Sequence, residues 1–457
     1  MIPRSMYISS YIRRIQVIHP SHILTHSRYI SANTISKDIQ QVGKHNFRTP
    51  RSYKRVVIVG TVMTIISYSL YIDSEYAVIN EMVKRFENPL LNKWDEVDSG
   101  TVITRENNNN SDEFIELLPR ENIENLLKPL LYNKNNAKMY AAIVGEIGTG
   151  KSTAVRKAIR SIQGPKGVIY CLIQAENNYF TELCTALGIR ITNNYFQQYV
   201  LKFIAPGKGI PIVPTMPTSN DPNILWNRIL KPLIETAAIK YKTIYKKQPV
   251  LVIDAADKIA KINPTFFRYL QEFAKESVDK GIIRIIFVFS DNANLPILMD
   301  PSNSYNSRLG TIIDIGDISD IDAITFLQNQ YKIEKSRATE IVNTITGGRF
   351  TMLNIYGKRG ITEPLDNIRN ELNNKTGAIF NDLHLNPSAP IFHKLIEAGT
   401  DGLSATIVSK LLNNQMCELL TQCKLLSFHA NCTYTVYDRH IEMFIKAKIQ
   451  AQAKEGK

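Results

Sequence analysis

The residues from Gly145 to Ser152 have the types and the spacing needed to hold a phosphate group. They read G-x-x-x-x-G-K-S and follow an apolar run at residues 139–144, which predicts a buried strand. A helical pattern follows them and stops before Gly164. Glycines at positions 145, 148 and 150 let the backbone turn its amides toward phosphate oxygens, and the start of the helix adds its positive dipole end.

The side chains of this loop complete the predicted site. Lys151 would neutralise the β- and γ-phosphates, and the Ser152 hydroxyl would bind Mg²⁺. We therefore expect the chain to bind ATP or ADP together with Mg²⁺. The residues predicted to surround the nucleotide are Gly145, Glu146, Ile147, Gly148, Thr149, Gly150, Lys151, Ser152 and Thr153.

Polar residues also end two further apolar runs. The apolar run at residues 249–253 is followed by Asp254. This pattern is typical of a central parallel strand that places a carboxylate at its carboxyl end. There Asp254 would hold a Mg²⁺-bound water, and Ser290, after the run at 282–289, would touch the γ-phosphate or the attacking water. Strand patterns at 167–173 and 310–315 alternate with helical ones. The sequence thus predicts an α/β fold, a parallel sheet with helices on both faces.

The basic residues of the chain are concentrated at its N-terminus. The formal net charge is +13 over 457 residues, and residues 1–55 contain ten Lys or Arg but one acidic residue, Asp38. This Arg-rich, acid-poor and amphipathic start predicts a mitochondrial presequence, with a merely disordered basic tail as the alternative. The remaining residues are nearly balanced in charge and give no argument for a polyanionic partner. The five cysteines show no metal-binding spacing and are expected to be reduced thiols.

Residues 56–72 carry no charge and are flanked by charged residues on both sides. Their length is near the lower limit for a membrane helix, so we expect a single span in a mitochondrial membrane, most simply the inner one. A buried helix of a folded domain is the alternative. The positive-inside rule would leave the body in the intermembrane space, but import pathways can override it. Residues 73–111 would form a linker, with a helix at 74–86 and a polar, flexible stretch at 98–111.

Two smaller parts are expected after the core, which would occupy residues 112–318. Residues 319–375 have helical periodicity and predict a small lid, and residues 376–457 predict short helices, a hairpin turning at 429–431 and a final helix. Three helices and a hairpin resemble a winged-helix domain. From residue 370 onward there are nine basic and eight acidic residues without a basic stripe, which favours a protein contact over DNA.

Residues 112–445 resemble the AAA-type P-loop ATPases, closest to the archaeal-type ATPase and STAND branch. The resemblance rests on LLPRENIENL, GEIGTGKST, PVLVIDAAD, FVFSDN, NSRLG and TGGRFTML. It implies that Arg308 acts as an arginine finger toward the γ-phosphate of a neighbouring subunit, and hence a homo-oligomer. It also implies that Arg349 contacts nucleotide from the lid, as a sensor-2 residue, and that Arg120 lies on the adenine side.

One departure from this family leaves the activity open. AAA enzymes usually place a glutamate directly after the Walker B aspartate, and this chain has Ala255 there. Asp257 is the acid that the STAND pattern allows; it would orient the attacking water, or only bind Lys258 or cap the following helix. Three functions therefore remain: a slow ATPase that couples nucleotide state to conformation or partner binding, a nucleotide switch or scaffold without turnover, and an ATP-dependent DNA-binding protein of the nucleoid.

Overall fold

The computed structural model describes residues 76–89, 101–104, 113–116, 120–132, 137–189, 221–292, 295–299 and 304–455. The expected presequence (1–55) and membrane helix (56–72) lie outside these residues. Within the described ranges, no helix is both long enough and apolar enough to cross a bilayer.

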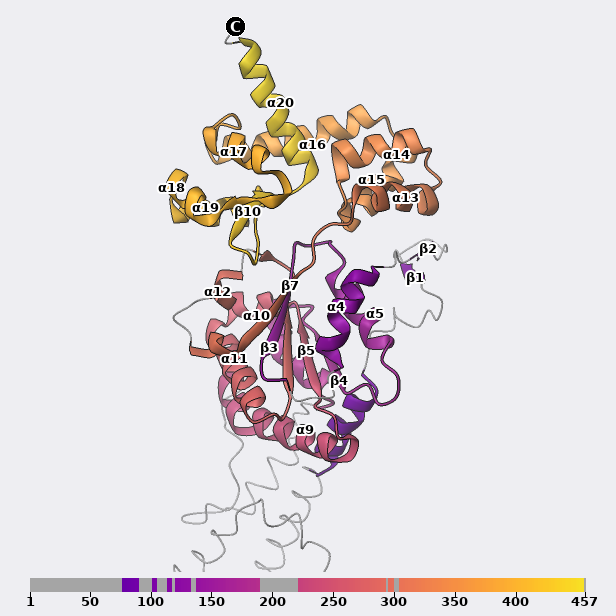
Figure 1. The fold of residues 1–457 in the computed structure, drawn as a ribbon, viewed down its shortest axis with the longest axis vertical. Helices are drawn as coiled ribbons and strands as arrows, with labels where there is room; N and C mark the ends of the chain where they lie inside the picture. Colours follow the sequence, from indigo (N-terminus) through magenta and orange to yellow (C-terminus); the bar gives the residue numbers. More distant parts are fainter. Residues whose placement is uncertain are drawn as a thin grey trace, which may run out of the picture. The chain divides into compact units, whose positions relative to one another are not determined.

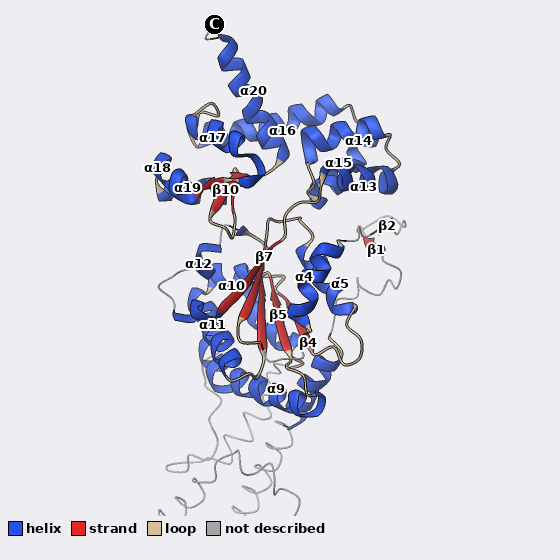
Figure 2. Ribbon diagram, viewed as in Figure 1, coloured by secondary structure: helices blue, strands red, loops and turns tan. Residues whose placement is uncertain are grey.

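Five strands of the core form a parallel sheet in the order β4-β5-β6-β3-β7 (Figure 2). Every neighbouring pair runs parallel, so the carboxyl ends of all five strands meet at one edge of the sheet, which we call the carboxyl edge. The predicted α/β architecture is therefore confirmed. The strands are β3 (Tyr140–Val144), β4 (Val168–Leu172), β5 (Val250–Asp254), β6 (Arg284–Val288) and β7 (Leu309–Asp314).

Helices cover both faces of this sheet, because successive strand residues point to opposite sides. Ala141 and Ile143 of β3 belong to one hydrophobic cluster with α4 and α5. Ala142 and Val144 belong to a larger cluster with residues 76–87 and with α6, α9, α10 and α11 (Figure 1). The helices and helical turns of the core are α4 (Glu121–Leu131), α5 (Lys151–Arg160), η3 (Glu176–Asn178), α6 (Tyr179–Ala186), α8 (Pro222–Leu225), η4 (Trp226–Leu230), α9 (Lys231–Tyr245), α10 (Ala256–Ile262), α11 (Pro264–Asp279), α12 (Leu295–Met299) and η6 (Ser304–Arg308).

The helix expected at 74–86 is observed at residues 76–87, and it packs against the core, although its stretch was expected to form a linker. Ile79, Met82, Val83 and Phe86 are buried, and their i, i+3, i+4, i+7 spacing places them on one face. This helix therefore belongs to the packed domain. The same expected linker contains β1 (Thr101–Thr104), which pairs antiparallel with β2 (Glu113–Glu116).

The predicted helical lid follows the sheet. The helices α13 (Asp320–Tyr331), α14 (Lys335–Ile341) and α15 (Phe350–Thr362), with the turn η7 (Val342–Thr346), pack around a third cluster. Ser319 caps α13 by accepting a hydrogen bond from the Asp322 N–H at 3.1 Å. The next helix, α16 (Leu365–Asp382), contributes Leu372 to this cluster and Phe380 to the following one. The expected domain boundary after residue 375 therefore falls inside α16.

The C-terminal region has the order of elements expected of a winged helix. After α17 (Pro390–Ala398) and the turn η8 (Gly399–Asp401) come the helices α18 (Ala405–Leu411) and α19 (Asn414–Gln422). Three short strands, β8 (Leu403–Ser404), β9 (Leu426–Phe428) and β10 (Thr433–Val436), pair in the order β8-β10-β9. The hairpin of β9 and β10 turns at residues 429–432, close to the predicted place. The expected final helix is present as α20 (Arg439–Glu455).

Candidate functional site

The predicted phosphate-binding loop connects β3 to α5, and its glycines adopt positive φ angles of 146° (Gly145), 87° (Gly148) and 89° (Gly150). A Cβ atom at Gly145 would lie 2.3 Å from the Ile315 carbonyl oxygen, and one at Gly148 would lie 2.1 Å from Thr351 Oγ1. Both separations are shorter than any side chain tolerates. Packing and backbone conformation therefore both require glycine at these positions.

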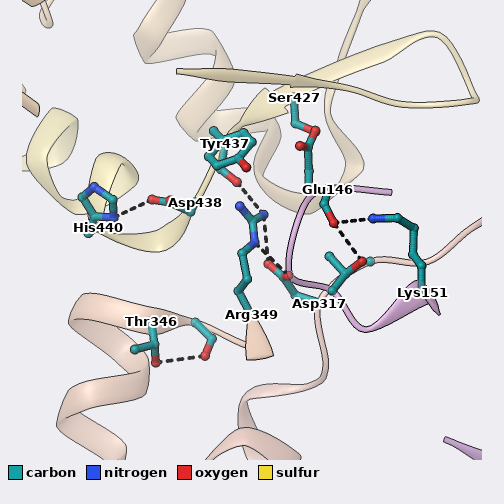
Figure 3. Close-up of polar contacts among 12 residues, drawn as sticks. Glu146, Lys151, Asp317, Thr346, Arg349, Ser427, Tyr437, Asp438 and His440 are labelled. Carbon is teal, nitrogen blue, oxygen red and sulfur yellow. Dashed lines mark hydrogen bonds and ion pairs between the residues drawn. The ribbon is translucent and has the colours of Figure 1, made fainter. Parts of the chain in front are cut away.

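Lys151 begins α5 and bends back into this loop. Its ammonium group donates to the Glu146 carbonyl oxygen at 2.6 Å (Figure 3), and the residue is only 5% exposed. The Thr149 N–H and hydroxyl also donate to this carbonyl, at 3.3 and 3.0 Å. Burial lowers the pKa of Lys151 to about 8, although Glu146, Asp254 and Asp257 act to raise it. Of the other predicted loop residues, Ser152 and Thr153 are half-buried in the first turn of α5, and Ile147 is exposed.

Because the pKa of Lys151 is lowered to about 8, we expect the affinity for nucleotide to change with pH in the alkaline range. The protonated amine attracts phosphate, so the affinity for Mg-ATP is expected to fall as pH rises through 8, by up to about tenfold per unit. Titration calorimetry at pH 7, 8 and 9, in buffers of different ionisation enthalpy, should show proton uptake on binding. A Lys151→Arg variant keeps its charge and should lack this dependence. An unchanged dissociation constant from pH 7 to 9 would show that Lys151 does not lose its proton in this range.

Asp254 ends β5 at the carboxyl edge and is fully buried. One of its carboxylate oxygens accepts a hydrogen bond from the Ala255 N–H at 2.8 Å, and the other accepts from the Tyr170 hydroxyl. Tyr170 lies on β4, which pairs with β5 in register. The carboxylate that we expect behind the metal is thus held from two sides. Tyr170 was not predicted, because a strand residue gives no sequence sign of which neighbouring side chain it meets.

Asp257 and Ser290 are in contact, but the contact is made by the backbone of Ser290 and not by its hydroxyl. The Ser290 N–H donates to Asp257 Oδ1 at 2.7 Å. Asp257 is 6% exposed, and burial raises its pKa to about 6, although the Ser290 N–H acts to lower it. The Lys258 ammonium donates to the carbonyls of Ile173 and Gln174, at 3.0 and 2.6 Å. Lys258 is thus held by the end of β4, and Asp257 is a buried carboxylate with an unusually high affinity for a proton.

Asn292 contacts the phosphate-binding loop directly, a role that sequence reasoning did not assign. Its side-chain oxygen accepts from the Gly145 N–H at 2.9 Å, and the residue is fully buried. Its position two residues after Ser290, where a strand reaches the carboxyl edge, was the available signal. Arg120 supports the loop from the other side: it donates to the Thr149 carbonyl at 2.8 Å and to the Gly316 carbonyl at 3.0 Å.

Arg349, the expected sensor-2 residue, is 5% exposed and held by the chain's own groups. It donates to Asp317 at 3.1 Å and to the Tyr437 carbonyl at 2.8 Å, and its guanidinium lies 4.5 Å from the centre of the Tyr437 ring (Figure 3). Burial is the largest single influence and lowers the pKa of Arg349, but Asp317, Tyr437 and Asp438 together outweigh it and raise this pKa. Arg349 thus ties the start of the lid helix α15 to the segment after β10.

The hairpin of β9 and β10, with the residues that flank it, contacts the same edge. Ser427 donates to the Glu146 carboxylate of the phosphate-binding loop (Figure 3), and Lys424 forms an ion pair with Asp291 at 2.5 Å. His429 lies 3.1 Å from the Asp314 carboxylate at the end of β7. Burial raises the pKa of Glu146, although Ser427, Arg349 and Lys424 act to lower it. No sequence pattern predicted these contacts, because they join residues far apart in the chain.

Arg308 lies away from this chain's own phosphate-binding loop. It ends η6 at the amino end of β7, whereas the loop follows the carboxyl end of β3, and these two strands are parallel. Its side chain is 45% exposed and pairs with Asp279. The structure therefore does not bring Arg308 together with the other predicted site residues.

Several buried polar atoms at the carboxyl edge have no partner among the described residues. They are Glu146 Oε2, Asn292 Nδ2 and Arg349 Nη1. Such atoms are costly to bury alone, which fits an edge that receives a polar ligand. The Ser152 hydroxyl and the Asp254 carboxylate supply the oxygen donors that Mg²⁺ prefers. In the described part of the chain, no group of three His, Cys, Asp or Glu side chains could hold a metal by itself.

Comparison with known proteins identifies the domain that carries this site. Residues 135–294, which contain β3 to β6 and the phosphate-binding loop, match the family model described as an AAA domain. This confirms the predicted AAA-type P-loop core. A comparison with curated proteins found no match.

Several solved structures are similar to the chain at low sequence identity. A Walker-type ATPase of Pyrococcus abyssi is 15% identical, with 72% of this chain and 96% of that chain covered and a TM-score of 0.45. The ORC2 protein of Aeropyrum pernix, in ADPNP and ADP complexes, is 15% identical, with 76% and 98% covered and a TM-score of 0.36. Drosophila ORC bound to DNA is 11% identical, with 74% and 89% covered and a TM-score of 0.32.

Proposed function

We propose that this chain, which carries an AAA domain, is a membrane-anchored ATPase that binds Mg-ATP, hydrolyses it slowly and couples the nucleotide state to the position of its C-terminal domain. One observation carries the proposal. Three groups from different elements meet at one edge of the sheet. They are the phosphate-binding loop with Lys151, the carboxylate of Asp254, and the carboxylate of Asp257, whose pKa is raised.

Each of these groups has a separate task in the proposed reaction. Lys151 and the amides of the loop hold the β- and γ-phosphates, while Ser152 and Asp254 would hold Mg²⁺. The metal, when bound, neutralises charge that develops on the phosphate oxygens. Asp257 orients the attacking water and accepts its proton, and its raised pKa makes it a better base than an ordinary aspartate. Without the usual glutamate after Asp254, we expect slow turnover.

The test of this function is a direct comparison of binding with turnover. Full-length protein in detergent is titrated with Mg-ATP by calorimetry, and phosphate release is then followed at saturating ATP. Binding with slow release supports the ATPase. Binding without release would support the nucleotide switch suggested by Ala255, and no binding by a folded sample would remove both.

The coupling to the C-terminal domain rests on the contacts of the β9–β10 hairpin. Ser427 binds Glu146 inside the loop that would hold phosphate, and Arg349 binds the Tyr437 carbonyl, so a nucleotide that engaged Glu146 or Arg349 would compete with these contacts. The hairpin thus contacts the core of its own chain. The helix α19, which a DNA-binding winged helix would place in the groove, carries Glu418 and no basic residue. We therefore favour this intramolecular role over the nucleoid alternative.

Removing the Lys424–Asp291 ion pair should loosen this coupling. The pair is partly buried, at 31% and 23% side-chain exposure, and such pairs contribute up to about 1 kcal/mol. Because the docked hairpin competes with nucleotide, a Lys424→Ala variant is expected to hold a fluorescent ADP analogue more tightly and to release it about two- to fivefold more slowly in stopped-flow measurements. Lys446→Ala removes a similar pair, with Glu442, inside α20 and should leave the rate unchanged. Equal rates in both variants would mean that the hairpin does not control nucleotide release.

The membrane and mitochondrial parts of the proposal rest on the sequence of residues 1–72. An acid-poor, Arg-rich start followed by an uncharged run of membrane length supports import and a single span, in the inner membrane. Alkaline carbonate extraction and protease protection of tagged mitochondria test both points, and the second also gives the side on which the ATPase domain lies. The homo-oligomer implied by Arg308 belongs to the same proposal, since its exposed position allows it to reach a neighbouring subunit.

A further inference from the structure

The outer side of α9 exposes aliphatic side chains that a globular domain usually covers. Ile239, in the middle of the helix, is 49% exposed, and Ile244, near its C-terminal end, is 53% exposed. Beside them lie Lys240, Lys242, Thr243 and Lys246, and we call these six residues the α9 face. A depression of about 540 Å³ is lined by four residues of this face, Ile239, Lys242, Thr243 and Lys246, and by residues 280–282. Two exposed β-branched aliphatic residues among lysines make a surface that is both apolar and basic.

The charge of the α9 face is not neutralised by its surroundings. Lys240 donates to the Asn80 side chain and lies 4.2 Å from the centre of the Tyr76 ring, while Lys242 donates to the Gly281 carbonyl at 2.7 Å. Among the described residues, Lys240, Lys242 and Lys246 form no ion pair. Acids on and beside α9 are engaged by other groups: Glu235 by Lys280 at 3.2 Å, Glu276 by Lys231 at 2.8 Å, and Glu87 by the Tyr245 hydroxyl at 2.8 Å. The face thus keeps three positive charges.

The α9 face lies on the side of the core away from the nucleotide site. The helix α9 runs directly into β5, whose amino end is Val250, while the site lies at the carboxyl end of the same strand, at Asp254 (Figure 1). A partner on this face would therefore leave the phosphate-binding loop accessible. The lid and the C-terminal region are joined to the opposite, carboxyl end of the sheet, through β7.

The chain reaches this face shortly after its uncharged segment. Tyr76, 55% exposed, begins the described helix 76–87 and contacts Lys240 through its ring. Tyr76 lies four positions after Ile72, the last residue of the uncharged run, and four residue steps span at most about 14 Å. If residues 56–72 cross a membrane, Tyr76 is held within this distance of the end of the span, and Lys240 of the α9 face lies against its ring. Tyrosine suits that position, since it is enriched at membrane interfaces.

We propose that the α9 face docks on an anionic phospholipid surface, with Ile239 and Ile244 entering the headgroup region and Lys240, Lys242 and Lys246 binding lipid phosphates. This inference rests on the membrane part of the proposed function and adds the orientation of the ATPase domain to it. Docking turns the carboxyl edge away from the bilayer and leaves the C-terminal domain free to move. With three lysines near the surface, we expect the α9 face to bind an anionic membrane about 100-fold more tightly than a neutral membrane.

Site-directed photo-crosslinking tests this docking in the full-length protein. Benzoylphenylalanine is placed at Ile244 and, as a control, at Ile355 on the lid, which is similarly exposed at 48%. The protein is combined with vesicles of phosphatidylcholine alone or with one third phosphatidylglycerol, and crosslinked lipid is measured by mass spectrometry. We expect at least tenfold more crosslinked lipid at position 244 than at 355, and at least tenfold more in the anionic vesicles.

Charge variants show whether the lysines are responsible. Replacing Lys240, Lys242 and Lys246 together by glutamine should lower the crosslinking at 244 to its level in neutral vesicles. Replacing Lys335, Lys394 and Lys410, which are exposed elsewhere, should leave it unchanged. Equal crosslinking at 244 and 355, or crosslinking of 244 to a second protein chain in place of lipid, would overturn the proposal.

Carbonate extraction of the same vesicles separates this result from failure of the anchor. If the protein is extracted but position 244 still crosslinks to anionic lipid, the predicted span is wrong and docking stands. If the protein resists extraction and position 244 does not crosslink, the span stands and docking is wrong.

Discussion

A Lys151→Ala variant is expected to bind Mg-ATP at least 100-fold more weakly than the wild type. The Lys151 ammonium is the cation placed in the phosphate-binding loop, and charge-assisted bonds to phosphate in a water-poor site contribute about 3 kcal/mol. The fold should survive the change, because Thr149 also donates to the carbonyl that Lys151 contacts. Burying the charged amine of Lys151 is also unfavourable in the folded protein, and the alanine variant removes this cost. Titration calorimetry with the full-length protein measures the effect directly.

Lys157→Ala is the matched control for this variant. Lys157 lies on the same helix, α5, and its amine pairs with Glu124 at 2.6 Å on the outer side. It should leave the affinity for ATP unchanged within about twofold. If the Lys151 variant retained wild-type affinity while folded, the loop between β3 and α5 would not be the nucleotide site, and the proposed function would fail with it.

An Asp257→Asn variant is expected to lower ATP turnover by about 10² to 10⁴-fold while changing the affinity for ATP by less than about threefold. Asparagine can still accept the hydrogen bond from the Ser290 N–H, so the local structure is kept, but it cannot accept the proton of water. In the wild type, turnover should fall about tenfold per pH unit below pH 6, as Asp257 becomes protonated. The variant should lack this acidic limb. Phosphate release across pH 5 to 8 provides the measurement.

Stability gives an independent check on this variant. The pKa of Asp257 is raised on folding, so the folded protein holds a proton that the unfolded chain has lost between about pH 4 and 6. Stability due to this group therefore falls as pH rises through that range, and the penalty is complete above pH 6. Asp257→Asn removes the penalty, so its melting temperature at pH 7 should equal or exceed that of the wild type. A destabilised variant would mean that its low turnover reports a structural role.

The phosphate-binding loop and the sheet around it could be predicted from the sequence, because local residue types determine them. A glycine-rich turn between a strand and a helix has few possible conformations, and Gly145 and Gly148 adopt the positive φ angles that only glycine tolerates easily. The run that ends in Asp254 became a buried strand for a similar reason: five consecutive apolar residues fit a site covered on both faces. The helix expected at 74–86 is also observed, and the spacing of Ile79, Met82, Val83 and Phe86 indicates the face by which it packs on the core.

Only the tertiary structure decided what surrounds this loop. Ser427 is 281 residues from Glu146 and Lys424 is 133 residues from Asp291, so no local pattern relates them. Arg349 shows the same limit, since its motif indicates a contact with nucleotide but not its bonds to Asp317 and to the Tyr437 carbonyl. Periodicity along one chain reports which side chains share a face, and hence which become buried. The partners that these side chains contact depend on how separate elements pack together, and this arrangement is determined by the whole chain rather than by a local pattern.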